Sequence, residues 1–332
     1  MSVRDTEKLN KTDLRYLLID SLRLYSDNVN FIDGNNPYRF SINKKTFYVL
    51  IRNVHESGDG RGNQDECRLQ ISKSTSFNQA LNSGSEVIVL GYLADEKVFT
   101  AWNPFLMRDR FNKKSSISLY SRFSVQRQAK AEKISAYRDN NDQSVISFIP
   151  DYLGLYLENL NSIHLLLDLE LKNLVEESDI LNDQDSDGQF TTSKGVVHTI
   201  THSRQKRDPK FADKVYDAYS NKCAMCGISL KLIEAAHIIP HSHELGTDDI
   251  DNGISLCALH HTAYDKSLIY FNEDLDIIIN ENKIAFLEKV GLDSGFRKFE
   301  GLAFDKIQIP TNHTLRPNLA NIKIANQSRG II

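Results

Sequence analysis

The chain has 332 residues, of which 40% are hydrophobic, and a formal net charge of −4 at pH 7. This length is enough for two ordinary domains, each with a core of its own. Because the net charge is slightly negative, the protein as a whole does not attract the phosphates of nucleic acid. Any nucleic-acid surface must therefore come from local clusters of Lys and Arg.

The N-terminus and the cysteines indicate the compartment. The opening residues, MSVRDTEKLN, are polar and lack the apolar segment of a signal peptide. No stretch approaches the roughly 18 apolar residues of a membrane span. Three of the four cysteines cluster at Cys223, Cys226 and Cys257, whereas a secreted disulfide framework would spread an even number along the chain. We therefore expect a cytoplasmic protein with reduced, metal-binding cysteines.

The N-terminal half predicts helices and strands in alternation. Leucines between residues 14 and 24 lie mostly on one side of a helix predicted for 13–25, with Thr12 or Asp13 as its cap. Runs rich in Val, Ile, Phe and Tyr, separated by turn residues, predict strands at 46–54, 67–72, 86–93 and 97–102. A leucine-rich segment at 152–177 predicts a helix that closes the domain. We expect a mixed α/β recognition domain over residues 1–180.

Basic and aromatic residues alternate between positions 108 and 138. Nine Lys or Arg stand there against Asp109 and Glu132, and aromatic residues such as Tyr120 and Phe123 lie among them, with Trp102 just before. Lys and Arg side chains can bind phosphates, and bases can stack on the aromatic rings. The pattern therefore fits a nucleic-acid surface. A solvated charged face above core aromatics explains it equally well. The candidate DNA-binding residues are Arg108, Arg110, Lys113, Lys114, Arg122 and Arg127.

An acidic and polar segment follows at residues 181–203, which we interpret as a linker. Beyond it, residues 204–332 predict a second domain. A helix near 207–219 leads into Cys223-x2-Cys226, and after thirty residues comes Cys257-x2-His260. Two such pairs can hold one tetrahedral Zn²⁺, so we predict a structural zinc site. The alternative is a set of ordinary buried thiols with a surface His260.

The segment between the two pairs predicts two strands and a helix. Residues 232–237 predict a strand that delivers His237 and ends near Pro240, and residues 252–257 predict a second strand. A helix from about 258 places His261 and Asp265 on one face, because they are four residues apart. Such a ββα unit is too small to fold without its metal. The whole chain is thus predicted to be of the α+β class.

This C-terminal part resembles the HNH, or ββα-metal, endonucleases, and most of all the group of predicted restriction endonucleases that carry this module at the C-terminus. The resemblance covers about residues 204–320. The residues that carry it are Cys223, Cys226, Ala236, His237, Ile238, Pro240, Asn252, Gly253, Leu256, Cys257, His260, His261 and Asp265.

The resemblance implies hydrolysis of double-stranded DNA, with 5′-phosphate and 3′-hydroxyl products. His237 would be the general base, which suits an imidazole, Asn252 would hold the hairpin, and His261 with Asp265 would hold a catalytic Mg²⁺ or Mn²⁺. Many relatives have Asp or His directly before the base, where this chain has Ala236. Glu234, His241 and His243 are the remaining candidates for an added metal ligand. By analogy, a double-strand cutter would work as a homodimer.

Several functional hypotheses stay open at this point. Within a DNA endonuclease, the N-terminal domain would read either a short duplex site or a modified base. A non-catalytic zinc protein that binds DNA is a second class, although such a protein needs no imidazole at position 237. A third is an effector nuclease whose N-terminal domain senses a ligand or a protein, for which the glycine-rich loop at 57–65 is the one supporting feature.

Overall fold

The computed structural model describes residues 8–26, 29–56, 64–107, 110, 114–139, 143–183, 188–191, 197–200, 209–240 and 243–332. The chain divides into two compact units. The N-terminal unit comprises Met1–Ser26, Gly34–Phe40 and Lys45–Ser203, and the C-terminal unit comprises Asp27–Asp33, Ser41–Lys44 and Arg204–Ile332. Helices and both parallel and antiparallel strand pairs are present, which confirms the α+β class.

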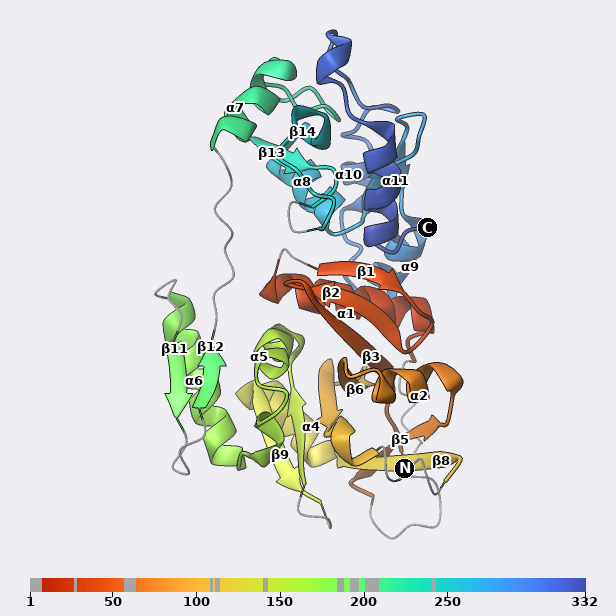
Figure 1. The fold of residues 1–332 in the computed structure, drawn as a ribbon, viewed down its shortest axis with the longest axis vertical. Coiled ribbons are helices and arrows are strands. Elements are labelled where there is room, and N and C mark those ends of the chain that lie inside the picture. Colours follow the sequence, from red (N-terminus) through yellow and green to blue (C-terminus); the bar gives the residue numbers. More distant parts are fainter. Residues whose placement is uncertain are drawn as a thin grey trace. The chain divides into compact units, whose positions relative to one another are not determined.

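The main sheet has seven strands in the order β1-β2-β3-β6-β7-β10-β9 (Figure 1). Its strands are β1 (Val29–Asp33), β2 (Tyr38–Ile42), β3 (Lys45–Asn53), β6 (Glu86–Leu93), β7 (Val98–Trp102), β10 (Ser144–Phe148) and β9 (Ile134–Arg138). Strands β3 and β6 are parallel, whereas β6, β7, β10 and β9 pair in antiparallel fashion. A second sheet contains β4 (His55–Glu56), β5 (Glu66–Ser72) and β8 (Ser116–Arg122).

The predicted N-terminal elements are confirmed with small shifts of their ends. All four predicted strands are present as β3, β5, β6 and β7. Helix α1 (Lys11–Tyr25) begins earlier than predicted, because Asn10 caps it instead of Thr12 or Asp13. The Asp13 amide donates to Asn10 Oδ1 at 2.9 Å, and the Asn10 amide donates to Asp13 Oδ2 at 3.2 Å. This capping box satisfies two amides that the first turn leaves without partners.

Trp102 ends strand β7 and packs across β6 at a glycine. A Cβ atom at Gly91 would lie 2.5 Å from a methyl of Val54 and 2.9 Å from the Trp102 ring. Only glycine leaves room for this ring against the strand. Trp102 is 5% exposed and belongs to the core cluster formed with helix α2 (Thr75–Asn82) and strands β5 and β8. Its position is thereby fixed by the packing.

The single helix predicted for 152–177 is wrong. The segment folds as α5 (Leu153–Glu158), a 3₁₀ turn and α6 (Asp168–Asp183). The turn buries the ring of His164, whose Nε2 pairs with the Tyr156 hydroxyl at 2.9 Å and whose Nδ1 donates to the Ser144 carbonyl at 2.8 Å. Burial lowers the pKa of His164 to about 4, so the ring is neutral. A continuous helix would break this pair of hydrogen bonds.

The remaining N-terminal elements are helix α4 (Phe123–Glu132) and a hairpin of β11 (Gly188–Thr191) and β12 (Val197–Ile200). This hairpin lies where the linker at 181–203 was expected, and α6 runs three residues into the same segment. Ordered structure thus replaces part of the predicted linker. Residues 57–63 of the glycine-rich loop lie outside the described part of the chain.

The C-terminal unit has the predicted ββα arrangement (Figure 1). Its elements are α7 (Pro209–Ala218), the antiparallel pair β13 (Ile233–His237) and β14 (Gly253–Cys257), α8 (Ala258–Asp265), the antiparallel pair β15 (Ile269–Phe271) and β16 (Ile277–Ile279), α9 (Glu281–Lys289), α10 (Phe296–Glu300) and α11 (Leu319–Ser328). Helix α11 was not predicted from the sequence.

Helix α7 packs directly on the strand pair. Phe211 and Val215 are buried on its inner face, and Tyr219, directly after the helix ends, is buried in the same core cluster. A Cβ atom at Gly253 would lie 2.5 Å from a Val215 methyl and 3.1 Å from the Phe211 ring. Glycine at this position therefore allows the helix to approach β14 closely. Phe211 reaches His237 through the same contact, because Gly253 is the strand partner of His237.

Candidate active site and metal centre

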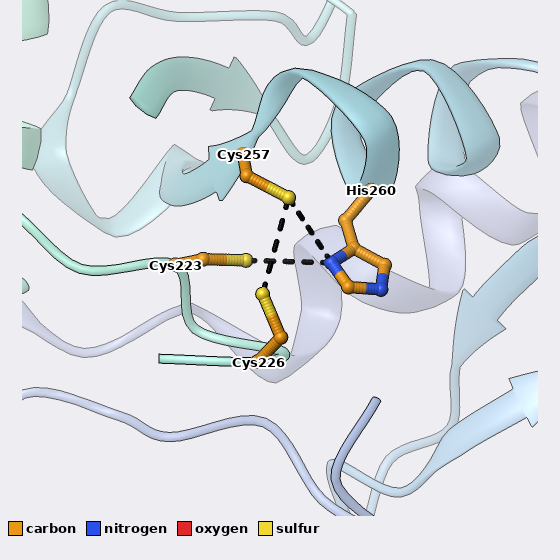
Figure 2. A group of neighbouring side chains, drawn as sticks. All are labelled: Cys223, Cys226, Cys257 and His260. Carbon is orange, nitrogen blue, oxygen red and sulfur yellow. Dashed lines mark hydrogen bonds between the residues drawn. The ribbon is translucent and has the colours of Figure 1, made fainter. Parts of the chain in front are cut away.

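Four potential metal ligands converge in the C-terminal unit (Figure 2). Cys223 and Cys226 lie in a tight turn, which is closed by hydrogen bonds from Gly227 N to the Cys223 carbonyl and from Cys223 N to the Ile228 carbonyl. Gly227 has a φ of +73°, a value that suits glycine. Cys257 ends β14, and one turn of α8 brings His260 beside it.

The distances fit a tetrahedral zinc site. Cys226 Sγ lies 3.9 Å from Cys257 Sγ, and His260 Nδ1 lies 3.6 Å from Cys223 Sγ and 3.3 Å from Cys257 Sγ. Zn–S bonds of about 2.3 Å at tetrahedral angles place two sulfurs roughly 3.8 Å apart. Among the residues that the structure describes, these four form the one group of three or more Cys, His, Asp or Glu with ligand atoms within 4.8 Å of one another.

The thiols lie close enough to shift one another's pKa values. Burial alone raises the pKa of Cys223, but hydrogen bonds with His260 and nearby backbone groups outweigh it and lower the pKa to about 6. Burial and the neighbouring Cys223 raise the pKa of Cys226 to about 12. Three thiolates this close repel one another unless a divalent cation lies between them. The donor set thus fits structural zinc.

His237 lies at the end of β13 and is held on two sides. Its Nε2 pairs with Asp248 Oδ1 at 2.8 Å. Its ring stacks on Phe211, with 4.2 Å between ring centroids and 11° between planes. The side chain is 8% exposed. A carboxylate on Nε2 holds the orientation of the ring and favours the tautomer with its proton on that nitrogen.

Asn252 joins the chain segments that carry His237 and Asp248. Its side chain accepts from the Ile239 amide at 2.9 Å and donates to the Ile239 carbonyl at 3.0 Å. It also donates to the Thr247 carbonyl at 2.9 Å. Ile239 lies two residues after His237 and Thr247 one residue before Asp248, so the buried Asn252 side chain sets the spacing of the His237–Asp248 pair. Its side-chain bonds thus go to Ile239 and Thr247, and its role in holding the hairpin stays a prediction.

His261 on α8 lies between two carboxylates. Its Nδ1 pairs with Glu234 Oε2 at 2.5 Å and its Nε2 with Asp265 Oδ2 at 3.2 Å. Glu234 comes from β13, so the strand and the helix both contribute to this cluster. Of the other candidates for a further ligand, His243 accepts a hydrogen bond from the Leu245 amide at 3.1 Å, and His241 lies outside the described residues.

The sequence analysis missed one residue near this cluster, Arg329, which follows helix α11. The side chain is 1% exposed. Its guanidinium donates to the Ile238 carbonyl at 2.9 Å, lies 4.0 Å from the Tyr264 ring centroid, and approaches Asp265 Oδ1 at 3.8 Å. Arg329 thereby connects the backbone next to His237 with the carboxylate of Asp265. No local sequence signal could have found it, because it belongs to none of the motifs.

The structure describes four of the six candidate DNA-binding residues, and Arg108 and Lys113 lie outside the described part. Arg110, Lys114, Arg122 and Arg127 are exposed or partly exposed in the N-terminal unit. Arg110 donates to the Ser118 carbonyl at 2.8 Å, and Arg127 lies 3.7 Å from Asp65. Arg110 and Arg122 line one cavity, together with Trp102 and Tyr120.

Comparisons with known proteins agree with this site. Residues 223–272 match the model of the HNH endonuclease family, and residues 45–157 match a family described as Methylase-associated X1. The C-terminal part of the chain therefore contains an HNH endonuclease domain, and the predicted resemblance is confirmed. No curated protein matches the chain.

Among solved structures, a chain described as "Modification dependent TagI restriction endonuclease" is similar over 90% of this chain and 84% of its own length. The identity is 13% and the TM-score is 0.27. A TM-score this low does not establish a shared fold. None of the described helices is both long and apolar enough to cross a bilayer.

Proposed function

We propose that the protein is a DNA endonuclease that hydrolyses phosphodiester bonds with His237 as its general base. The observation that carries the proposal is the His237–Asp248 pair, which lies within the segment that matches the HNH family. A zinc module that only binds DNA has no use for an imidazole held by a carboxylate beside its metal centre. This pair therefore favours catalysis over the non-catalytic alternative.

The geometry supports the following proton transfer. Asp248 accepts the Nε2 proton of His237, so Nδ1 is the basic atom of the ring. Nδ1 takes a proton from water as the water oxygen bonds to phosphorus. The bond from phosphorus to the 3′-oxygen breaks, and the 3′-oxygen leaves with the electron pair and takes up a proton. The products carry 5′-phosphate and 3′-hydroxyl ends.

His261 and Asp265 would hold the catalytic Mg²⁺ or Mn²⁺, with Glu234 fixing the His261 ring from the other side. Such a cation would stabilise the negative charge that develops on the phosphate and the leaving oxygen. Octahedral Mg²⁺ at about 2.1 Å needs neighbouring ligands roughly 3 Å apart and commonly takes its other ligands from water and phosphate. The 3.2 Å separation of His261 Nε2 and Asp265 Oδ2 fits that requirement.

Cleavage of plasmid DNA tests the proposal directly. We expect the full-length protein to nick or linearise a supercoiled plasmid when Mg²⁺ or Mn²⁺ is added, and the ends to be ligated without prior phosphorylation. Methylated and unmethylated plasmid should be compared side by side, because they separate a reader of an unmodified site from a reader of a modified base. Intact plasmid in every combination would refute the proposed function.

The proposal assigns DNA binding to the basic residues of the N-terminal unit. Replacing both Lys114 and Arg127 by Gln should weaken binding to all DNA sequences alike, because phosphate contacts carry no base information. The slope of log affinity against log salt should fall by about 0.9 per lost contact. The matched control is Lys130→Gln, since Lys130 lies in the same basic stretch but forms a closer ion pair, with Glu96 at 3.0 Å, than Arg127 forms with Asp65 at 3.7 Å. An unchanged slope in the double variant would remove these residues from the DNA surface.

A further inference from the structure

A cavity of about 880 Å³ opens in the N-terminal unit and contains none of the candidate catalytic residues. Residues from β5, β7, β8, β9 and β10 line it, so its walls belong to the two sheets of that unit. The volume lies within the roughly 300–1,000 Å³ typical of small-molecule pockets. The cavity is therefore large enough for a ligand, and the HNH chemistry does not account for it.

Aromatic side chains are fixed at one wall of this cavity. The Trp102 indole donates to the Tyr120 carbonyl at 2.9 Å, and the Tyr137 hydroxyl donates to the same carbonyl at 2.8 Å. One backbone oxygen thus holds two rings that line the cavity. The Arg122 guanidinium lies over the Tyr137 ring, 4.8 Å from its centroid. Trp102 is buried in the wall, whereas the Tyr137 ring is partly exposed and can serve a planar ligand as a preformed stacking partner.

Polar groups and charges are divided between the lining and the exposed edge. Glu66, Asn103, Asp139 and Gln143 are partly buried in the lining, whereas Arg110 and Arg122 are exposed. Carboxylates and amides can bond the donors and acceptors on the edge of a base, and arginines can bind phosphate. A ligand that is planar and uncharged at one end and anionic at the other matches this arrangement, and a nucleotide has that chemistry.

We propose that this cavity receives a nucleobase that is extruded from the DNA duplex, and this inference rests on the proposed DNA endonuclease function. A free mononucleotide shares the chemistry of the base and one phosphate. Two arginines, Arg110 and Arg122, line the cavity, however, and the exposed Lys114 and Arg127 lie only four and five residues further along the chain. One phosphate does not need this many cations. Their number favours a DNA strand that extends beyond the extruded base.

Equilibrium binding to duplexes tests the proposal with the full-length protein and no added Mg²⁺ or Mn²⁺. The probes are short duplexes in which a central A, C, G, T or 5-methylcytosine faces an abasic position, and the same duplexes fully paired. An unpaired base costs less to extrude, so we expect at least one unpaired probe to bind about tenfold more tightly than its paired form. Tyr137→Ala should lower the affinity for that unpaired probe by roughly 5- to 150-fold, the range for a lost base–aromatic stack.

Two variants control for folding. Tyr137→Phe keeps the ring and should retain most of the preference for the unpaired probe over its paired form. Tyr48→Ala removes another partly buried tyrosine of the same core cluster that does not line the cavity, and it should leave the preference unchanged. Glu66→Gln is nearly isosteric and should alter which base is preferred, with little change in melting temperature.

Each outcome decides between the alternatives. The proposal is overturned if Tyr137→Ala still prefers the unpaired probe to its paired form. It is also overturned if Tyr48→Ala loses this preference to the same extent as Tyr137→Ala. A parent protein that binds DNA but treats all paired and unpaired probes alike overturns it too. If deoxynucleoside monophosphates bind the parent, lose affinity in Tyr137→Ala and are not displaced by any duplex, the cavity is an effector site. Failure of the parent to bind any DNA would instead refute the proposed function.

Discussion

Replacing His237 by Ala is expected to lower the rate of DNA cleavage by about 10²–10⁴-fold, the usual contribution of a general base. The base acts only in the transition state, so DNA affinity and the melting temperature should stay near those of the parent. Loss of the ring also removes its stacking contact with Phe211, but this contact lies at the end of β13 and not in the middle of the hairpin. Single-turnover cleavage and DNA binding without added metal measure the two effects separately.

Two further variants show whether the loss reflects the proposed proton transfer. Asp248→Asn keeps a hydrogen-bond partner for Nε2 but removes the charge, so its rate should lie between those of His237→Ala and the parent. His313→Ala removes an exposed histidine of the same unit and should cleave like the parent. Equal rates for His237→Ala and the parent would eliminate His237 as the base.

Replacing Cys257 by Ser is expected to unfold the C-terminal unit. The binding of structural zinc contributes about 10–16 kcal/mol in small zinc modules. That is as large as the entire stability of a typical domain, roughly 5–15 kcal/mol, so the remaining packing cannot replace it. Elemental analysis of the parent should find about one zinc per chain, as expected for a four-ligand site. Loss of zinc and of the cooperative melting of this unit should occur together in the variant.

Cys67→Ser is the matched control, because Cys67 is a buried thiol in the N-terminal unit, outside the metal centre. It should keep the zinc content and leave the C-terminal unit folded. A parent protein that is free of zinc after purification, and still folded and active, would contradict the zinc assignment.

The sequence by itself determined the features that depend on short spacing. Two ligand pairs, each separated by two residues, are enough to identify the zinc centre, because a tight turn and the first turn of a helix each bring such a pair together. The i, i+4 spacing likewise places His261 and Asp265 on one helical face. The sequence pattern also predicted helix α7 and the strand β13 that delivers His237.

Only the tertiary structure decided which distant residues complete the site. Asp248 lies 11 residues from His237, Glu234 lies 27 from His261, and Arg329 lies 91 from Ile238. The N-terminal cavity likewise collects Trp102, Tyr120 and Tyr137 from three strands of two sheets. Periodicity and motif spacing describe only neighbours along one element, whereas these contacts depend on how separate elements pack, which no local pattern specifies.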